Sequence, residues 1–260
     1  VAVVVVGTTA EVESEGFDRP SLALPGRQDE LVRRVAAANP RTVVVVNSGA
    51  PVLLPWAGDV AAVLLTWFGG QEFGHALADV LLGDTEPGGR LPTTWPASEA
   101  GLLSTRPADG ILAYTEGLFI GYRGYDRDGR APLYPFGHGT GYTTWSYDSI
   151  TADDVPGERD GSRVAVRVQV RNTGTRRGRE VIQVYASRPD SAVERPVKWL
   201  AGFAVMAAAP GETVSAEINV PERVFQHWSE QGWALEPGTF VLSAGSSSAD
   251  LPLASRVQLK

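Results

Sequence analysis

The sequence predicts an α/β domain followed by an all-β domain, because the hydrophobic pattern changes its period partway along the chain. In the first part, continuous apolar runs alternate with stretches of helical spacing, which indicates a largely parallel sheet whose strands are connected by helices. In the second part, short alternating stretches are separated by turns that contain Gly or Pro, which is typical of a β-sandwich of immunoglobulin or fibronectin type.

The strands of the first domain are expected at three apolar runs: 1–6, 42–46 and 60–67. None of the three alternates with polar residues, so burial on both faces of the sheet is expected. Helices are expected at 25–39 and 71–82, where apolar residues recur on one helical face. Pro25 suits a first helical turn, and Gly83 suits the position just after a helix end.

The strands of the second domain are short and regularly spaced: 163–170, 181–185, 197–205, 213–220, 238–244 and 256–259. Turn residues separate them, as at 172–174, 210–211 and 237–238. Between the two domains lies a stretch that is rich in Gly, Tyr and Pro and reads as irregular. We therefore predict an α/β sandwich portion at 1–96, a connecting segment at 97–145 and a fibronectin-III-like sandwich at 146–260.

The composition excludes several classes of function. The 260-residue chain has a net charge of −7, which argues against nucleic acid or an anionic membrane as a partner. It contains no Cys, which excludes a disulfide framework and a thiolate nucleophile but leaves the compartment, secreted or cytoplasmic, open. The chain starts without Met on a buried-strand pattern. We therefore expect sequence upstream of it, which would carry any signal peptide.

The loop after the first predicted strand, residues 7–19, is strongly acidic. Ligands of open parallel sheets bind beyond the carboxyl ends of the strands, where this loop lies. Its carboxylates are Glu11, Glu13, Glu15 and Asp18. Repulsion within such a cluster disfavours full ionisation, which suits a general acid. A solvated acidic loop explains the same residues, so the pattern alone leaves both interpretations open.

Other kinds of site lack support in the sequence. The three histidines, His75, His138 and His227, are scattered and do not have the spacing of a metal motif. No serine lies in a nucleophile-elbow motif, and no glycine pattern matches a phosphate or dinucleotide loop. We therefore expect neither a metal nor a cofactor.

An ordered set of motifs resembles glycoside hydrolase family three, the β-glucosidase and β-xylosidase family. The matching stretches in the first part are 13–19, 24–31, 44–51, 67–72, 78–83, 87–96, 114–126 and 134–144. Those in the second part are 172–174, 181–185, 210–212 and 235–240. Any one of these motifs is weak evidence, whereas their common order along nearly the whole chain is specific.

The resemblance implies a retaining, exo-acting β-glycosidase built from an N-terminal barrel, an α/β sandwich and a fibronectin-III-like domain. The barrel, which carries the nucleophilic Asp in this family, is absent from this chain and becomes its expected partner. The position that matches the acid/base is Glu15, with Glu13 as the alternative because short acidic loops align ambiguously. Phe17 is the candidate for contact with the β-glycoside substrate.

Two other functions stay open at this stage. The chain could serve as a non-catalytic sugar-binding or scaffolding module, or belong to a member that uses a His of the barrel as acid/base. The family acts on glucosides, xylosides, arabinosides and glycosylated natural products, and the sequence does not select among these substrates. The chain alone is expected to be inactive.

Overall fold

The computed structural model describes residues 1–103, 105–155 and 163–260. The chain forms two compact units, each assembled from three stretches. The first consists of Val1–Leu82, Trp95–Arg106 and Pro132–Tyr134. The second consists of Gly83–Thr94, Pro107–Ala131 and Pro135–Lys260. The predicted domain limits near residues 96 and 145 stay a prediction.

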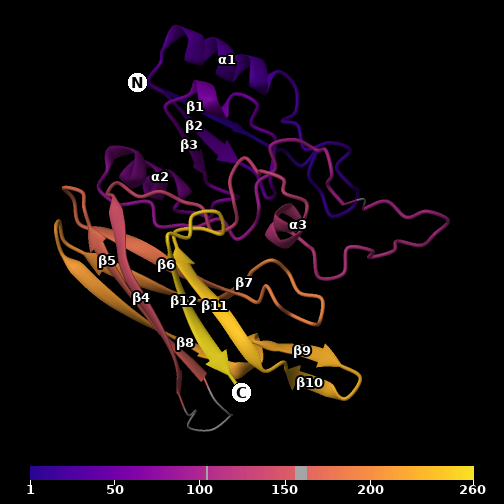
Figure 1. Cartoon of the computed structure of the whole chain (residues 1–260). Helices are drawn as coiled ribbons and strands as arrows, with labels where there is room; N and C mark the ends of the chain where they lie inside the picture. The colour runs from indigo at the N-terminus through magenta and orange to yellow at the C-terminus, as the bar shows by residue number, and fades with distance from the viewer. Residues whose placement is uncertain (104, 156–162) are drawn as a thin grey trace. The chain divides into compact units, whose positions relative to one another are not determined.

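The first unit contains a parallel sheet in the order β1-β2-β3 (Figure 1). Its strands are β1 (Ala2–Gly7), β2 (Thr42–Asn47) and β3 (Ala62–Leu65). Val4 pairs with Val44, and Val44 with Val63, so the carboxyl ends of the strands lie along one edge. Helices α1 (Gln28–Ala38) and α2 (Phe73–Leu82) connect the strands or follow them, with a short 3-10 turn, η1 (Ala57–Asp59), before β3.

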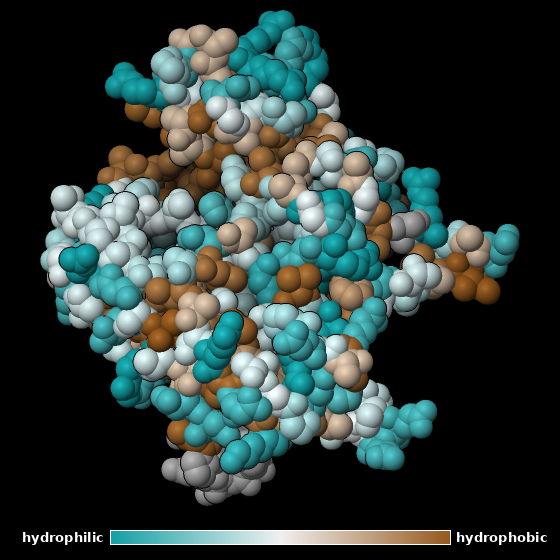
Figure 2. Space-filling view, in the orientation of Figure 1, coloured by the Kyte–Doolittle hydropathy of each residue, from teal (hydrophilic) through white to brown (hydrophobic). Residues whose placement is uncertain are grey.

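Strand β1 is buried on one face only, which differs from the expectation, whereas Val44, Val45 and Val46 of β2 are fully buried on both faces. Val4 and Val6 are 7% and 3% exposed, whereas Val3 and Val5, which point the other way, are 49% and 59% exposed. Helix α1 packs on β1 and β2 and buries Val32 completely. Helix α2 buries none of its residues. Figure 2 shows brown, hydrophobic side chains exposed in the region of this sheet and α2.

Glycines with positive φ angles set the start of α1 and the end of α2. Helix α1 begins at Gln28, three residues after the predicted start at Pro25, because Gly26 has a φ of +64° that no right-handed helix accommodates. Helix α2 ends at Leu82 and is followed by Gly83, whose φ of +83° gives the left-handed residue expected at a helix terminus.

The second unit is an antiparallel β-sandwich, which confirms the predicted fold class of α/β followed by all-β (Figure 1). One sheet has the order β12-β11-β6-β7 and the other β4-β5-β8. The strands are β4 (Trp145–Val155), β5 (Arg163–Asn172), β6 (Gly178–Ser187), β7 (Trp199–Ala208), β8 (Thr213–Pro221), β11 (Gly238–Gly245) and β12 (Leu253–Leu259).

The sandwich core comes from the alternation read in the sequence. The predicted inward residues of β5, Val164, Val166, Val168 and Val170, are at most 1% exposed. They share a core with Ile182, Val184, Phe240 and Leu242 of the opposite sheet. This is the burial expected when the inner faces of two sheets interdigitate.

Four elements of the second unit were not predicted from the sequence: α3 (Tyr122–Arg127), β4, and the strands β9 (Gln226–Ser229) and β10 (Gly232–Leu235). The pairing of β4 with β5 shifts its register between Tyr147 and Ser149, which disturbs the two-residue alternation. Strands β9 and β10 form a hairpin of four residues a side, too short for a periodic signal. A further 3-10 turn, η2 (Glu222–Val224), precedes them.

Candidate active site

The acidic loop follows β1 and starts beside the end of β2. The backbone N–H of Thr8 donates to the carbonyl of Asn47 at 3.0 Å, which continues the parallel pairing one residue past β1. The loop therefore lies at the carboxyl edge of the sheet, the position at which open parallel sheets bind ligands. This placement agrees with the sequence expectation for the loop.

Gln28, the first residue of α1, ties the start of the loop at Gly7 to Pro25, which lies between the loop and the helix. Its side-chain oxygen accepts from the N–H of Gly7 at 2.7 Å, and its Nε2 donates to the carbonyls of Gly7 at 2.9 Å and Pro25 at 3.1 Å. A single amide side chain thus replaces hydrogen bonds that the backbone loses when the strand ends.

Glu13 is turned into the loop. Its backbone N–H and that of Val12 donate to the carbonyl of Thr9 at 2.9 and 3.0 Å, which closes a tight turn. Its carboxylate accepts from the hydroxyl of Thr8 and, at 3.4 Å, from the N–H of Gly49, which lies just beyond β2. Glu13 is half-buried.

Glu15 lies at the tip of the same loop and is exposed. Ser14 and Phe17 form an isolated antiparallel bridge on either side of it, and the Ser14 hydroxyl accepts from the N–H of Gly16 at 3.1 Å. The carboxylate of Glu15 makes no hydrogen bond or ion pair with any residue that the structure describes. Phe17 is 48% exposed next to it. The loop therefore presents one free carboxylate with an exposed aromatic ring close by in sequence.

Glu99 holds the chain just after this loop, a role that no sequence pattern indicated. Its carboxylate accepts from the hydroxyl of Ser21 at 2.7 Å and from the N–H of Leu22 at 2.5 Å. These two hydrogen bonds, with a smaller contribution from the charge of Arg19, lower the pKa of Glu99. The partners are 78 and 77 positions apart from Glu99, so no local pattern connects them.

Arg19 is the last residue of the loop, and its guanidinium has terminal nitrogens without hydrogen-bond partners in the described chain. Both of these nitrogens are buried. A buried cationic donor of this kind favours nearby negative charge.

The described residues carry neither a metal cluster nor a membrane-spanning helix. No group of three or more His, Asp or Glu side chains in that part of the chain is arranged to hold a metal ion. None of the helices it contains is long and apolar enough to cross a membrane.

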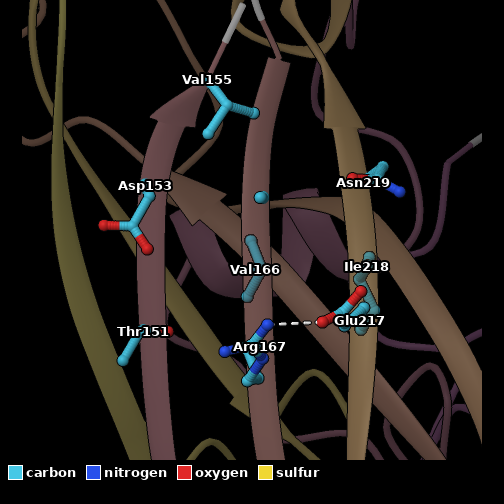
Figure 3. Close-up of a pocket in the computed structure, with 9 residues that line it drawn as sticks. Thr151, Asp153, Val155, Val166, Arg167, Glu217, Ile218 and Asn219 are labelled. Atoms are coloured by element: carbon cyan, nitrogen blue, oxygen red, sulfur yellow. Dashed lines mark hydrogen bonds and ion pairs between the residues drawn. The ribbon is translucent and has the colours of Figure 1, made fainter.

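A surface hollow lies on the sandwich, and none of the predicted site residues lines it (Figure 3). Strands β4, β5 and β8 line it, with Asp153, Arg167 and Asn219 among its polar residues. Arg167 and Glu217 form an ion pair of 2.5 Å there, with side chains 61% and 68% exposed. The hollow therefore holds charges that already neutralise each other in solvent.

Comparison with known families decides the identity of the fold. The glycosyl hydrolase family 3 C-terminal domain matches residues 1–142. A fibronectin type III-like domain matches residues 180–248. The chain belongs to glycosyl hydrolase family 3. The resemblance drawn from the motifs is thus confirmed.

Relatives of known name are β-glucosidases from fungi and bacteria. A probable beta-glucosidase I of Aspergillus fumigatus is 40% identical over 266 residues, covering 98% of this chain and 32% of the relative. The thermostable beta-glucosidase B of Acetivibrio thermocellus is also 40% identical, over 100% of this chain and 35% of the relative. This family 3 chain therefore spans about a third of the length of these relatives.

Solved structures of family 3 enzymes have the same fold. DesR, a β-glucosidase from Streptomyces venezuelae solved in complex with D-glucose, superimposes with a TM-score of 0.92 at 38% identity. The match covers 100% of this chain and 34% of DesR. A β-glucosidase from Kluyveromyces marxianus, solved in complex with glucose, gives a TM-score of 0.90 at 38% identity over 100% of this chain.

Proposed function

We propose that this chain is the C-terminal part of a retaining β-glycosidase of the β-glucosidase type, with Glu15 as its general acid/base. The proposal rests on a difference in hydrogen bonding and exposure between the two candidate carboxylates, Glu13 and Glu15. Glu13 is occupied by Thr8 and Gly49, whereas Glu15 is exposed and unpaired within the described chain. A group that exchanges protons with a substrate needs the freedom that Glu15 has.

The chemistry requires a second carboxylate from outside this chain. A retaining glycosidase holds two carboxyl groups about 5–5.5 Å apart, one as nucleophile and one that switches from acid to base. Glu15 would protonate the departing glycosidic oxygen and then take a proton from the attacking water. The nucleophile would be an Asp on an upstream barrel of the same protein, so the chain by itself would be inactive.

Phe17 fits a role in substrate contact. It is two residues beyond Glu15 and nearly half of its side chain is exposed. An aromatic face attracts the weakly positive C–H groups of a sugar ring because its π-system carries negative charge there. We place Phe17 against the group that departs with the oxygen that Glu15 protonates.

The test replaces Glu15 with Gly in the polypeptide that carries both this chain and the barrel. Loss of a general acid lowers turnover by about 10²–10⁴-fold. The loss of kcat/KM should be large for alkyl glucosides, whose leaving groups need protonation, and small for dinitrophenyl glucoside, whose kcat falls because the attacking water has lost its base. Azide should restore part of the turnover of activated substrates, giving a glycosyl azide. Glu11→Gln, an exposed carboxylate of the same loop, is the matched control, and near-normal turnover of the Glu15 variant would refute the assignment.

A second function, sugar binding without catalysis, is favoured by an aromatic pair on the sandwich. Trp228 of β9 and Trp233 of β10 are cross-strand partners, 68% and 46% exposed, with ring centroids 5.3 Å apart. The guanidinium of Arg223 lies 3.3 Å above the Trp233 ring. Isothermal titration of the isolated chain with cello-oligosaccharides separates the two functions, because a binding module retains sugar without the barrel.

A further inference from the structure

The carboxylate of Glu13 joins two segments that are far apart in sequence. Thr8, which donates its hydroxyl, belongs to the start of the acidic loop, and Gly49, which donates its N–H, follows β2. The two donors come from adjacent parallel strands, at the same edge of the sheet. Glu13 therefore ties the loop to the segment just beyond β2.

Gly49 is a glycine for a steric reason. A Cβ added to it would lie 2.6 Å from Oε1 of Glu13 and 2.7 Å from Cε2 of Phe68. Contacts this short force a neighbour to move. The Glu13 carboxylate thus occupies the space that any larger residue at position 49 would need, and the close approach depends on the missing side chain.

We propose that Glu13 is a positioning residue that braces the loop so that Glu15 is presented in one place. This inference rests on the proposed function for what Glu15 does, but not for how the loop is held. The carboxylate of Glu15 makes no hydrogen bond or ion pair within the described chain, and the Ser14–Phe17 bridge beside it is confined to the tip of the loop. The location of Glu15 is set by the turn that Thr9 closes and by the anchor that Glu13 provides two residues earlier.

The value of such a brace follows from the geometry of proton transfer. An acid/base acts within hydrogen-bond reach of the glycosidic oxygen, and a displacement of about 1 Å can cost on the order of 10²-fold in rate. An exposed loop without an anchor would spend most of its time away from that position. The brace restricts the loop before substrate arrives, so less order has to be imposed on binding.

The first experiment measures loop order in the 260-residue chain, without turnover. Three variants disturb the brace from different sides: Thr8→Val, Glu13→Ala and Gly49→Ala. Each should speed hydrogen exchange of the hydrogen-bonded loop amides, those of Thr8, Val12 and Glu13, by roughly tenfold or more, because these amides are protected only while the loop is closed. Thr9→Val and Glu11→Gln alter neighbouring side chains that have no partner in the described chain. They should leave exchange unchanged.

The second experiment measures turnover in the polypeptide that also carries the barrel. Glu13→Ala should lower kcat/KM for alkyl glucosides by about tenfold or more while kcat/KM for dinitrophenyl glucoside stays nearly unchanged, since kcat/KM reports the first step and only the alkyl leaving group needs a placed acid there. For dinitrophenyl glucoside kcat and KM should fall together, because the second step uses Glu15 as base for every substrate. Glu13→Gln keeps one acceptor oxygen and should recover part of the loss.

The outcomes separate the brace from the role of Glu15. Unchanged loop exchange in Glu13→Ala, or an equal loss of kcat/KM for both classes of leaving group, would overturn the brace. A Glu15 variant with normal turnover, together with faster exchange in the three brace variants, would instead overturn the acid/base assignment and leave the brace standing.

Discussion

Glu180 is a buried carboxylate, and its neighbours determine how much its burial costs in folding stability. Its side chain is 5% exposed, and that of Arg90, whose Nη2 lies 2.7 Å away, is 13% exposed. The hydroxyl of Tyr147 donates to its other oxygen at 2.8 Å. Burial raises the pKa of Glu180, against the opposing effects of Arg90 and Tyr147. The fold therefore tolerates the charged form only because Arg90 lies opposite.

We expect Arg90→Met to destabilise the protein strongly at neutral pH. Removing one partner of a buried pair leaves an uncompensated charge, at a cost of about 3–5 kcal/mol. A raised pKa means that the folded state favours the neutral carboxyl, so the stability that Glu180 contributes falls as pH rises through its folded pKa. The loss caused by Arg90→Met should therefore be larger at pH 7 than near pH 5, as measured by urea unfolding.

The exposed pair on β5 and β8 is the control for this experiment. Arg167 and Glu217 have side chains 61% and 68% exposed, and surface pairs of this kind contribute about 0–1 kcal/mol. Arg167→Met should therefore change the free energy of unfolding little at either pH. Equal losses for the Arg90 and Arg167 variants would show that the burial of the Arg90 pair does not matter.

At the scale of single residues, the sequence located the loop but could not rank its carboxylates. Glu11, Glu13 and Glu15 alternate in one short stretch and have the same chemistry. What distinguishes Glu13 is a backbone N–H that lies 36 positions away, at Gly49. The family motif selected Glu15 by its position. The structure shows how Glu13 differs from it, through a partner that only the fold brings close.

At the scale of elements, the end of β1 depends on a close approach between strands. The Cβ of any residue larger than glycine at position 7 would overlap the carbonyl oxygen of Asn47, the acceptor for Thr8. Gly7 is also held by Gln28 through both its N–H and its carbonyl. The passage from strand to acidic loop therefore has room for glycine alone.

Gly7→Ala should lower the free energy of unfolding by about 1–3 kcal/mol, the usual cost of forcing extra volume into a packed site. Gly74→Ala in α2 is the control, because a Cβ there meets no atom within 4 Å. It should raise stability by up to about 1 kcal/mol through helix propensity. Thermal unfolding of both variants checks the pair, and a neutral Gly7→Ala would mean that the strands separate at no cost.

Helices and strands were predictable from the sequence where their apolar residues recur without interruption over enough positions. Strand β5 was found because its four buried valines alternate without interruption. Strand β4 was missed because a register shift breaks its alternation, and β9 with β10 because two four-residue strands hold too little pattern. The apolar run of β1 indicated a strand correctly, but its composition could not show that one face lacks a cover within this chain.

At the scale of the whole molecule, the exposed face of β1 and the greater length of the relatives have the same explanation. Val3 and Val5 are about half exposed on a strand that is otherwise entirely apolar, and the chain spans only about a third of its family 3 relatives. A sheet with a solvent-facing side normally carries polar residues there. We propose that this face is covered by the upstream part of the same protein.

Replacing Val3 and Val5 together with Thr tests this cover. In the isolated chain the double variant should change stability by no more than about 0.5 kcal/mol, because Thr keeps the branched shape and its hydroxyl reaches water. In the polypeptide with its upstream part, the same change should cost about 2 kcal/mol or more, since two hydroxyls become buried without partners.

Val4 and Val6 provide the internal comparison for that test, because they are already buried in this chain. Val4→Thr with Val6→Thr should destabilise the isolated chain and the longer polypeptide alike. Denaturant unfolding of both pairs in both polypeptides gives the four values needed. If the cost in free energy of unfolding differs between the two polypeptides only for the Val3 and Val5 pair, the covered face is the one that carries Val3 and Val5. A small cost for this pair in both polypeptides would show that nothing packs on them.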